Sequence, residues 1–177
     1  MASRNTKKDL INAMKILLKS KKFENITVQN IIDIAEVSRG TFYRYFKDKY
    51  DVMNLFYLDQ IERIINSSNN DYKWATRAII QFVMDYCDYF KGVLSSTGPN
   101  SFNNLVFTCS KTFYSMVYQN KYKLTNKADI PEHIDFATDF LANGCVYIID
   151  KWIINSSCVS AEQITDWLYK MTPDELQ

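Results

Sequence analysis

The sequence predicts an all-α protein, and three observations support this fold class. Only 4 glycines and 3 prolines occur among 177 residues, so the chain has few positions that interrupt a helix. Apolar residues make up 47% of the chain and recur at the three- and four-residue spacing of a helix face. No stretch alternates apolar and polar residues in the way that indicates a strand.

The first 35 residues predict two helices. Thr27 is a suitable N-cap, because its hydroxyl can accept a hydrogen bond from a free backbone N–H of the following turn. A short second helix is therefore expected from about Val28 to Ala35. The first helix is indicated by an apolar stripe at helical spacing, made of Leu10, Ile11, Met14, Leu17 and Leu18.

The following residues predict a tight turn and two more helices. Glu36–Val37 form the turn, and Ser38 caps a third helix that runs from Arg39 to about Phe46. Asp48 caps a long fourth helix. Two short helices joined by a three-residue turn form a helix-turn-helix pattern.

The rest of the chain continues the helical pattern. The polar run Asn66–Asp71 is the clearest break, and residues 92–100, which contain Gly98 and Pro99, predict a loop. Ser160 and Gln163 have the spacing of a capping box. Further helices are expected at about 72–90, 101–120, 131–155 and 160–171.

The predicted third helix has two chemically different faces. Phe42 and Phe46 are four residues apart, so they share one face and anchor the helix to a core. Arginine can bond bidentately to guanine, threonine can contact the thymine methyl group, and tyrosine hydroxyls can reach phosphates. The outward and flanking residues of the helix supply an arginine, a threonine and tyrosine hydroxyls, together with a glycine that has no side chain. They are Gly40, Thr41, Tyr43, Arg44 and Tyr45.

Gly40 has two interpretations that the residues alone leave open. A helical glycine costs about 1 kcal/mol relative to alanine, and its missing side chain would let a partner approach the backbone closely. Alternatively, Gly40 lies in the first turn, where the penalty is smaller and no benefit is required.

Charge is distributed unevenly along the chain. Residues 1–50 hold 11 Lys/Arg and 5 Asp/Glu, a net charge of +6, whereas residues 51–177 carry a net charge of −5. A basic N-terminal segment followed by an acidic remainder is typical of a protein in which one part binds a polyanion.

These motifs resemble the DNA-binding domain of TetR-family regulators. The resemblance covers about residues 6–55 and rests on Phe23–Ile31 and Ala35–Lys49, where Thr-Val, Val-Ser-Arg-Gly-Thr-Phe-Tyr and Tyr-Phe-x-Asp-Lys follow in order at the family's spacing. It implies a sequence-specific DNA-binding transcription regulator. The N-terminal three-helix helix-turn-helix domain would occupy residues 1–50, and a C-terminal helical effector-binding and dimerisation domain would occupy residues 51–177.

The resemblance also implies roles for individual residues. The segment Ser38–Tyr45, with Gly40, would enter the major groove of double-stranded DNA. The base readers would be Arg39, Thr41 and Arg44. The phosphate contacts would be Tyr43, Tyr45 and Lys49, with Thr27 and Gln29 at or near the phosphates. The expected activity is that of a repressor controlled through its C-terminal domain; the alternative is a coregulator or activator that acts through a protein partner.

The C-terminal half resembles the family more loosely. Phe140–Gly144, Lys151–Ile154 and Trp167–Leu168 are similar to the ending of a TetR subgroup that includes regulators of dihydroxyacetone kinase operons. Residues 131–155 and 160–171 are expected to form a two-fold homodimer. One helix-turn-helix reads too few base pairs to select a site, whereas a dimer reads a near-palindromic operator.

The helix expected at 131–155 carries an apolar arc wider than one neighbour requires. Gly144, near its middle, would allow close approach of a helix from a second copy or from the same chain. One stripe contains Phe136, Phe140, Gly144, Ile148 and Trp152; a second, overlapping stripe contains Phe140, Leu141, Cys145, Ile149, Trp152 and Ile153. A small-molecule effector pocket is expected within residues 72–155, with its ligand and its lining residues unknown.

An enzyme is disfavoured. The single histidine, His133, lies beside Pro131 and Glu132, which suit the start of a helix. There is no glycine-rich phosphate loop, nucleophile elbow or telling Cys/His spacing, so no cofactor and no metal are expected. The cysteines, which lack Cys-x-x-Cys spacing, are interpreted as structural; they are Cys87, Cys109, Cys145 and Cys158. No stretch reaches the roughly 20 apolar residues of a membrane span, and no signal peptide is recognised, so a cytoplasmic protein is expected.

Overall fold

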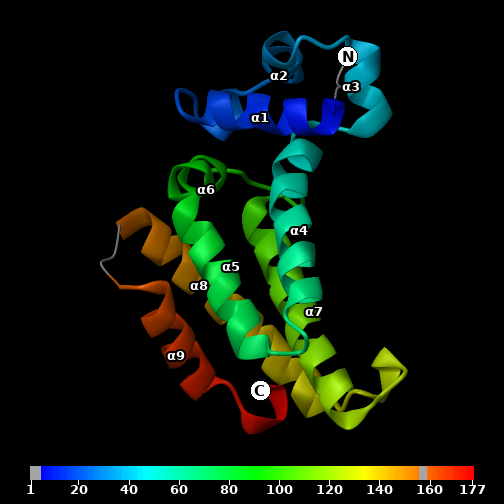
Figure 1. Ribbon diagram of the computed structural model, residues 1–177, viewed down its shortest axis with the longest axis vertical. Helices are drawn as coiled ribbons and strands as arrows, with labels where there is room; N and C mark the ends of the chain where they lie inside the picture. The colour runs from blue at the N-terminus through cyan, green and yellow to red at the C-terminus, as the bar shows by residue number, and fades with distance from the viewer. Residues whose placement is uncertain (1–4, 156–158) are drawn as a thin grey trace. The chain divides into compact units, whose positions relative to one another are not determined.

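The computed structural model describes residues 5–155 and 159–177, and these residues form helices joined by turns (Figure 1). The all-α prediction is confirmed. The helices are α1 Thr6–Leu18, η1 Phe23–Asn25, α2 Val28–Ala35, α3 Arg39–Tyr45, α4 Lys49–Ser67, α5 Tyr72–Asp85, α6 Cys87–Val93, α7 Phe102–Tyr122, η2 Lys127–Asp129, α8 Glu132–Asn155, α9 Ala161–Met171 and η3 Asp174–Leu176.

Two compact units make up the chain. The N-terminal unit comprises the chain up to Glu62 together with Tyr86–Phe102, and the C-terminal unit comprises Arg63–Asp85 and Asn103–Gln177. The functional division expected at residue 50 remains a prediction.

Fully buried side chains from different helices hold the N-terminal unit together. Leu10 and Met14 of α1, Phe23 of η1, Ile31 of α2 and Phe42 of α3 have no exposed surface. Burial of each such side chain stabilises the fold by about 1.5–3 kcal/mol. The first helices therefore form one core beneath the helix-turn-helix.

An aromatic cluster forms a second part of the same unit. Phe56 and Tyr57 of α4 meet Phe90 of α6 with ring centroids 6.4 and 6.1 Å apart, and Phe102 lies 5.1 Å from Phe90. The hydroxyl of Tyr89 donates a hydrogen bond of 2.9 Å to the Met53 carbonyl oxygen. Phe90 and Phe102 are thus core residues.

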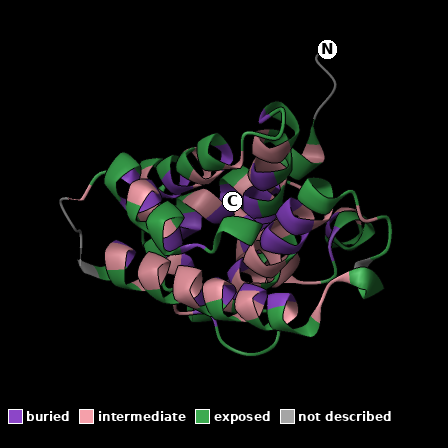
Figure 2. Ribbon diagram, turned by 90° about the horizontal axis from the view of Figure 1, so that it is seen from below, coloured by how far each residue is buried: buried purple, intermediate pink, exposed green. Residues whose placement is uncertain are grey.

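In the C-terminal unit, α8 packs against α7, and α9 packs against α5. Tyr114 and Tyr118 of α7 share a cluster with Ile134, Leu141 and Cys145 of α8. In the ribbon coloured by burial, buried positions gather on the sides of helices that face other helices, and exposed positions on the outward sides (Figure 2).

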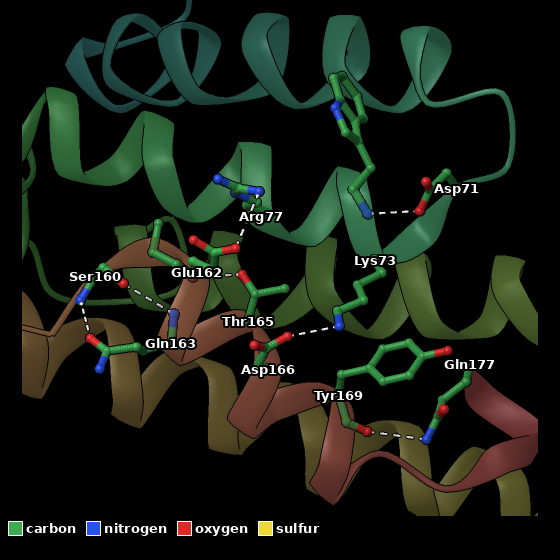
Figure 3. A network of polar contacts seen from close by, with 12 residues as sticks. Asp71, Lys73, Arg77, Ser160, Glu162, Gln163, Thr165, Asp166, Tyr169 and Gln177 are labelled. Atoms are coloured by element: carbon green, nitrogen blue, oxygen red, sulfur yellow. Dashed lines mark hydrogen bonds and ion pairs between the residues drawn. The ribbon is translucent and has the colours of Figure 1, made fainter.

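Polar contacts join α9 to α5 along their exposed edges (Figure 3). Lys73 Nζ lies 2.7 Å from Asp166 Oδ1, and Arg77 Nη1 lies 3.7 Å from Glu162 Oε1. The predicted capping box of α9 is confirmed, since the Ser160 hydroxyl accepts a hydrogen bond from the backbone N–H of its N3 residue and that residue's side chain accepts from the Ser160 N–H.

The pattern at 72–90 contains a break that the sequence does not predict. Instead of one helix, α5 ends at Asp85 and α6 begins at Cys87, with Tyr86 at φ −115° and ψ 28°. No glycine or proline marks this position. Within the described residues, no helix is both long and apolar enough to cross a membrane.

Two cysteines behave as the sequence suggests. Burial raises the pKa of the Cys109 thiol to about 11 and also raises the pKa of Cys145, whose Sγ lies 3.8 Å from the Tyr114 hydroxyl. A raised pKa disfavours the reactive thiolate, so these side chains act as small apolar groups. Cys158 lies outside the described residues.

Candidate nucleic-acid interface

Reciprocal hydrogen bonds define the start of α2. The Thr27 hydroxyl accepts a hydrogen bond of 3.2 Å from the Asn30 N–H, and Asn30 Oδ1 accepts one of 3.2 Å from the Thr27 N–H. Thr27 is therefore the N-cap of α2, as predicted. The Asn30 half of this capping box was missed, because glutamate or glutamine is the usual residue at that position.

The turn between α2 and α3 is formed by a left-handed residue. Glu36 has φ 51° and ψ 47°, and the Val37 N–H donates to the Ile32 carbonyl at 3.2 Å. Ser38 then caps α3 by accepting a hydrogen bond of 3.0 Å from the Thr41 N–H. The turn and both caps match the prediction, and α3 ends one residue earlier than expected.

Two phenylalanines hold α3 against the core. Phe42 is fully buried and Phe46 is 5% exposed, with ring centroids 5.8 Å apart. The rest of the helix is available to a partner. Its exposed residues are Ser38, Arg39, Gly40, Tyr43, Arg44 and Tyr45, and Thr41 is half-buried.

The two arginines of α3 lie beside tyrosine rings. Arg39 Cζ is 5.7 Å from the Tyr43 ring centroid, and Arg44 Cζ is 5.3 Å from the Tyr45 ring centroid. Among the described residues, neither guanidinium forms an ion pair with a carboxylate. Each therefore keeps its N–H donors available, and a guanidinium of this kind suits guanine edges and phosphates.

Thr27 and Gln29 are both exposed at the first turn of α2. Thr27 uses its oxygen as an acceptor within the capping box, and its hydroxyl hydrogen can still donate. Gln29 Nε2 donates to Asp33 Oδ1 at 2.7 Å, which leaves a second amide N–H. Both side chains can reach an anion at this end of the helix.

Lys49 differs from the other candidate residues. Its ammonium group donates hydrogen bonds to the carbonyl oxygens of Phe23, Glu24 and Ile26 at 2.9, 3.1 and 2.9 Å. Burial lowers the pKa of Lys49, whereas the nearby charges of Glu24 and Asp48 raise it. Its ammonium is thus directed at a backbone turn within the N-terminal unit.

Two family models match the chain. The model described as "Bacterial regulatory proteins, tetR family" matches residues 7–54. The model described as "Transcriptional regulator C-terminal region" matches residues 70–174, more than half of the chain.

Individual proteins are also similar. The transcriptional activator DhaS of the dhaKLM operon from Lactococcus lactis subsp. lactis (strain IL1403) is 27% identical over 75 residues, which are 42% of this chain and 40% of that protein. The matched part thus spans less than half of this relative.

Two solved structures share the fold over nearly the whole chain. The dihydroxyacetone kinase operon activator DhaS has a TM-score of 0.70 at 17% identity, with 96% of this chain and 95% of that chain covered. A TetR transcriptional regulator from Streptococcus agalactiae 2603V has a TM-score of 0.66 at 24% identity, with 94% and 93% covered. The family models, together with this fold and the capped helix-turn-helix, lead to one conclusion: the chain belongs to the TetR family of transcriptional regulators.

Proposed function

We propose that the protein regulates transcription as a homodimer that binds a near-palindromic operator in double-stranded DNA through α3. One observation carries this proposal: α3 is anchored by Phe42 and presents outward two arginines without a carboxylate partner among the described residues, together with hydroxyl groups and a glycine. This combination fits the edges of base pairs and the phosphates that flank them.

Each side chain has a role in this proposal. Arg44, Arg39 and Thr41 read base edges in the major groove. The hydroxyls of Tyr43 and Tyr45 bond phosphates on either side. The DNA phosphate backbone is contacted by Thr27 and Gln29, and by Ser38 at the N-cap of α3. At these helix ends, free backbone N–H groups also favour an anion.

The homodimer is supported by an apolar surface on α8 and α9. Phe136 and Phe140 are 74% and 72% exposed on α8, and Tyr147 and Ile154 continue the surface at 64% and 66%. Monomeric proteins rarely leave such a contiguous apolar patch in water. A self-complementary patch of this kind gives a closed two-fold dimer.

A groove and a glycine add to this support. Trp152, Trp167 and Met171 line an apolar groove of about 300 Å³ beside α9. Beyond the adjoining turns of α8 itself, no atom of the described residues lies within 4 Å of a Cβ placed on Gly144, so a helix from another copy has room to approach there.

Selection of duplexes from a random library tests the proposal. We expect enrichment of a near-palindrome whose half-sites are one helical turn or a multiple of one apart. Binding should weaken steeply with salt, because lysines and arginines release counterions from phosphates. Recovery of no consensus, or of binding without sequence preference, would refute specific operator recognition.

The direction of regulation has two candidates. Repression follows if the dimer occupies a promoter, with control exerted through the C-terminal unit. Activation is the second candidate, because the similar protein from Lactococcus lactis is named a transcriptional activator. A reporter carrying the selected operator would distinguish them by the sign of its response to the protein.

Control by a small molecule or a protein partner is part of the same proposal. The pocket lined by Tyr72, Phe113 and Tyr114 holds only about 20 Å³, enough for one water molecule. The exposed aromatic residues of this half are spread over several helices: Trp74 on α5, Tyr122 on α7, Phe136, Phe140 and Tyr147 on α8, and Trp167 and Tyr169 on α9. Titration of operator binding with candidate ligands and partner proteins would separate the two forms of control.

A further inference from the structure

The ammonium group of Lys49 lies in a cage built from backbone and rings. Three carbonyl oxygens, those of Phe23, Glu24 and Ile26, lie at 2.9–3.1 Å from Nζ. The Phe23 and Tyr50 ring centroids lie 4.6 and 5.9 Å away. An ammonium has three N–H donors and no acceptor, so every donor is already used.

The carbonyls belong to the turn that leads into α2. The short helix η1 ends at Asn25, Ile26 follows with extended backbone angles, and Thr27 is the N-cap of α2. Phe23 is fully buried and Ile26 is 1% exposed, so side chains hold this turn on its inner side. The Lys49 ammonium holds the same turn through its backbone carbonyl oxygens.

Lys49 itself begins α4, the helix that follows α3. Asp48 caps this helix by accepting hydrogen bonds from the N–H groups of Tyr50 and Asp51 at 2.8 and 3.0 Å. The cage thus joins the residues just before α2 to the residues just after α3. Both ends of the helix-turn-helix are fixed to each other through one side chain.

We propose that Lys49 is a positioning residue that sets Thr27 and Gln29 relative to the reading face of α3, and that it does not bind a DNA phosphate. This inference rests on the proposed function. The family resemblance suggested a phosphate contact, but such a contact would require the ammonium to leave three carbonyl oxygens. Three hydrogen bonds, two of them part-buried, would have to break for that contact to form.

Arginine and methionine at this position separate the two roles. Lys49→Arg keeps the charge, yet a planar guanidinium with a rigid fork of donors cannot match three converging carbonyls. We expect Lys49→Arg and Lys49→Met each to lose roughly tenfold in operator affinity. Lys49→Arg should keep the parent's dependence of affinity on salt. Lys47→Met, which changes an exposed lysine nearby, is the matched control.

The affinities are measured on folded protein, at temperatures below the melting transition of each variant. The proposal is overturned if Lys49→Arg binds like the parent while Lys49→Met loses about one unit of salt slope, the signature of a phosphate contact. It is equally overturned if both variants melt earlier but bind with unchanged affinity, because Lys49 would then only stabilise the fold.

A second measurement needs no variant. Acetylation of the unmodified protein, read by mass spectrometry, should modify Lys47 readily and Lys49 slowly, both without DNA and with it. A Lys49 that reacts freely in the absence of DNA and becomes protected on binding would contradict the cage. Because this readout in the free protein does not depend on operator binding, failure of the cage and failure of the proposed function remain distinguishable.

Discussion

Helices α3 and α8 both leave aromatic residues exposed, but the chemistry around those residues differs. On α3, Tyr43 and Tyr45 are 48% and 40% exposed and lie beside Arg39 and Arg44. On α8, the most exposed aromatic side chains are phenylalanines, which offer no hydrogen bond. Exposed aromatic residues with cations and hydroxyls suit a polyanion, whereas exposed phenylalanine suits another apolar surface.

Each of the two helices also carries a glycine with open space beside it. Among the described residues outside the adjoining helical turns, a Cβ on Gly40 would meet Ser38 Oγ at 3.9 Å, and a Cβ on Gly144 would meet no atom within 4 Å. Neither glycine is therefore required by packing within the described chain. Of the two partners considered for Gly144, a helix of the same chain is ruled out among the described residues.

The largest effect is expected from a charge in the α8 surface. Phe140→Glu would bury two carboxylates at a two-fold contact, one from each copy. At about 2 kcal/mol for each copy, the dimer should weaken roughly a thousandfold. Sedimentation equilibrium should then give a mass near 20.8 kDa, against about twice that mass for the parent.

Trp74→Glu is the control for this experiment, since Trp74 is an exposed aromatic residue of α5 outside the α8–α9 surface. It should leave the mass unchanged. A parent that already sediments near 20.8 kDa at micromolar concentration would remove the basis for the dimer and for paired half-sites.

On the α3 side of the comparison, Arg44→Ala should relax the sequence preference. The expected loss is about 1–3 kcal/mol at the base pair that Arg44 reads, with little loss on non-specific DNA. Competition titrations against operator and random duplexes measure both quantities. The control is Lys47→Ala, which should reduce affinity for the two duplexes equally or not at all. If Arg44→Ala loses the same affinity for both duplexes, Arg44 contacts phosphates and does not read a base.

The two glycines give a finer test. Gly40→Ala should leave the free protein as stable as the parent, because the methyl group has space. It should weaken operator binding by about 1 kcal/mol if the α3 backbone approaches DNA closely. Unchanged operator binding would favour the simpler interpretation, in which Gly40 merely occupies the first turn.

Gly144→Ala is the counterpart on α8. Alanine should stabilise the helix itself by up to about 1 kcal/mol, since no neighbouring helix in the described part of the chain opposes the methyl group. If a second copy packs against this position, the dimer dissociation constant should rise at the same time. Thermal melts at two protein concentrations, combined with sedimentation, separate these opposing effects. An unaffected dimer would place Gly144 outside the contact.

The smallest effect is expected from the charged edge of the C-terminal unit. The hydrogen bond and the charge of Lys73 lower the pKa of Asp166, so this contribution to stability is present above the pKa of the unfolded carboxyl group. It is lost as the pH falls through the folded pKa, which lies below the ordinary value of 3.8. Asp166→Asn should therefore melt slightly below the parent at neutral pH, and the difference should vanish in strong acid or high salt.

The helix-turn-helix could be predicted from the sequence because its determinants are local. Thr27 and Ser38 cap their helices through residues three positions away, and Phe42 and Phe46 share a face because a helix repeats every 3.6 residues. Other features had no such signal. The break at Tyr86 contains no glycine or proline, so no local signal marks the end of α5.

The apolar arc of α8 shows where sequence reasoning stops. Two overlapping stripes were predicted, and the structure turns Leu141, Cys145 and Ile153 inward while Phe136 and Phe140 face outward. Tyr147 and Ile154, which extend the exposed surface, belonged to neither stripe. Hydrophobicity alone does not determine which of two apolar faces of one helix is buried. The position of the neighbouring helices determines it.

The sequence by itself therefore determined the fold class, the helix caps and the division of α3 into a buried and an exposed face, since these depend on residues within one or two helical turns. Only the tertiary structure decided the role of Lys49. Its three carbonyl partners lie 23–26 residues earlier in the chain, and a lysine after a helix-turn-helix has the same sequence signature whether its ammonium meets a phosphate or the backbone. An ammonium group binds any oxygen that the fold brings within reach, and chain folding alone sets which oxygens those are.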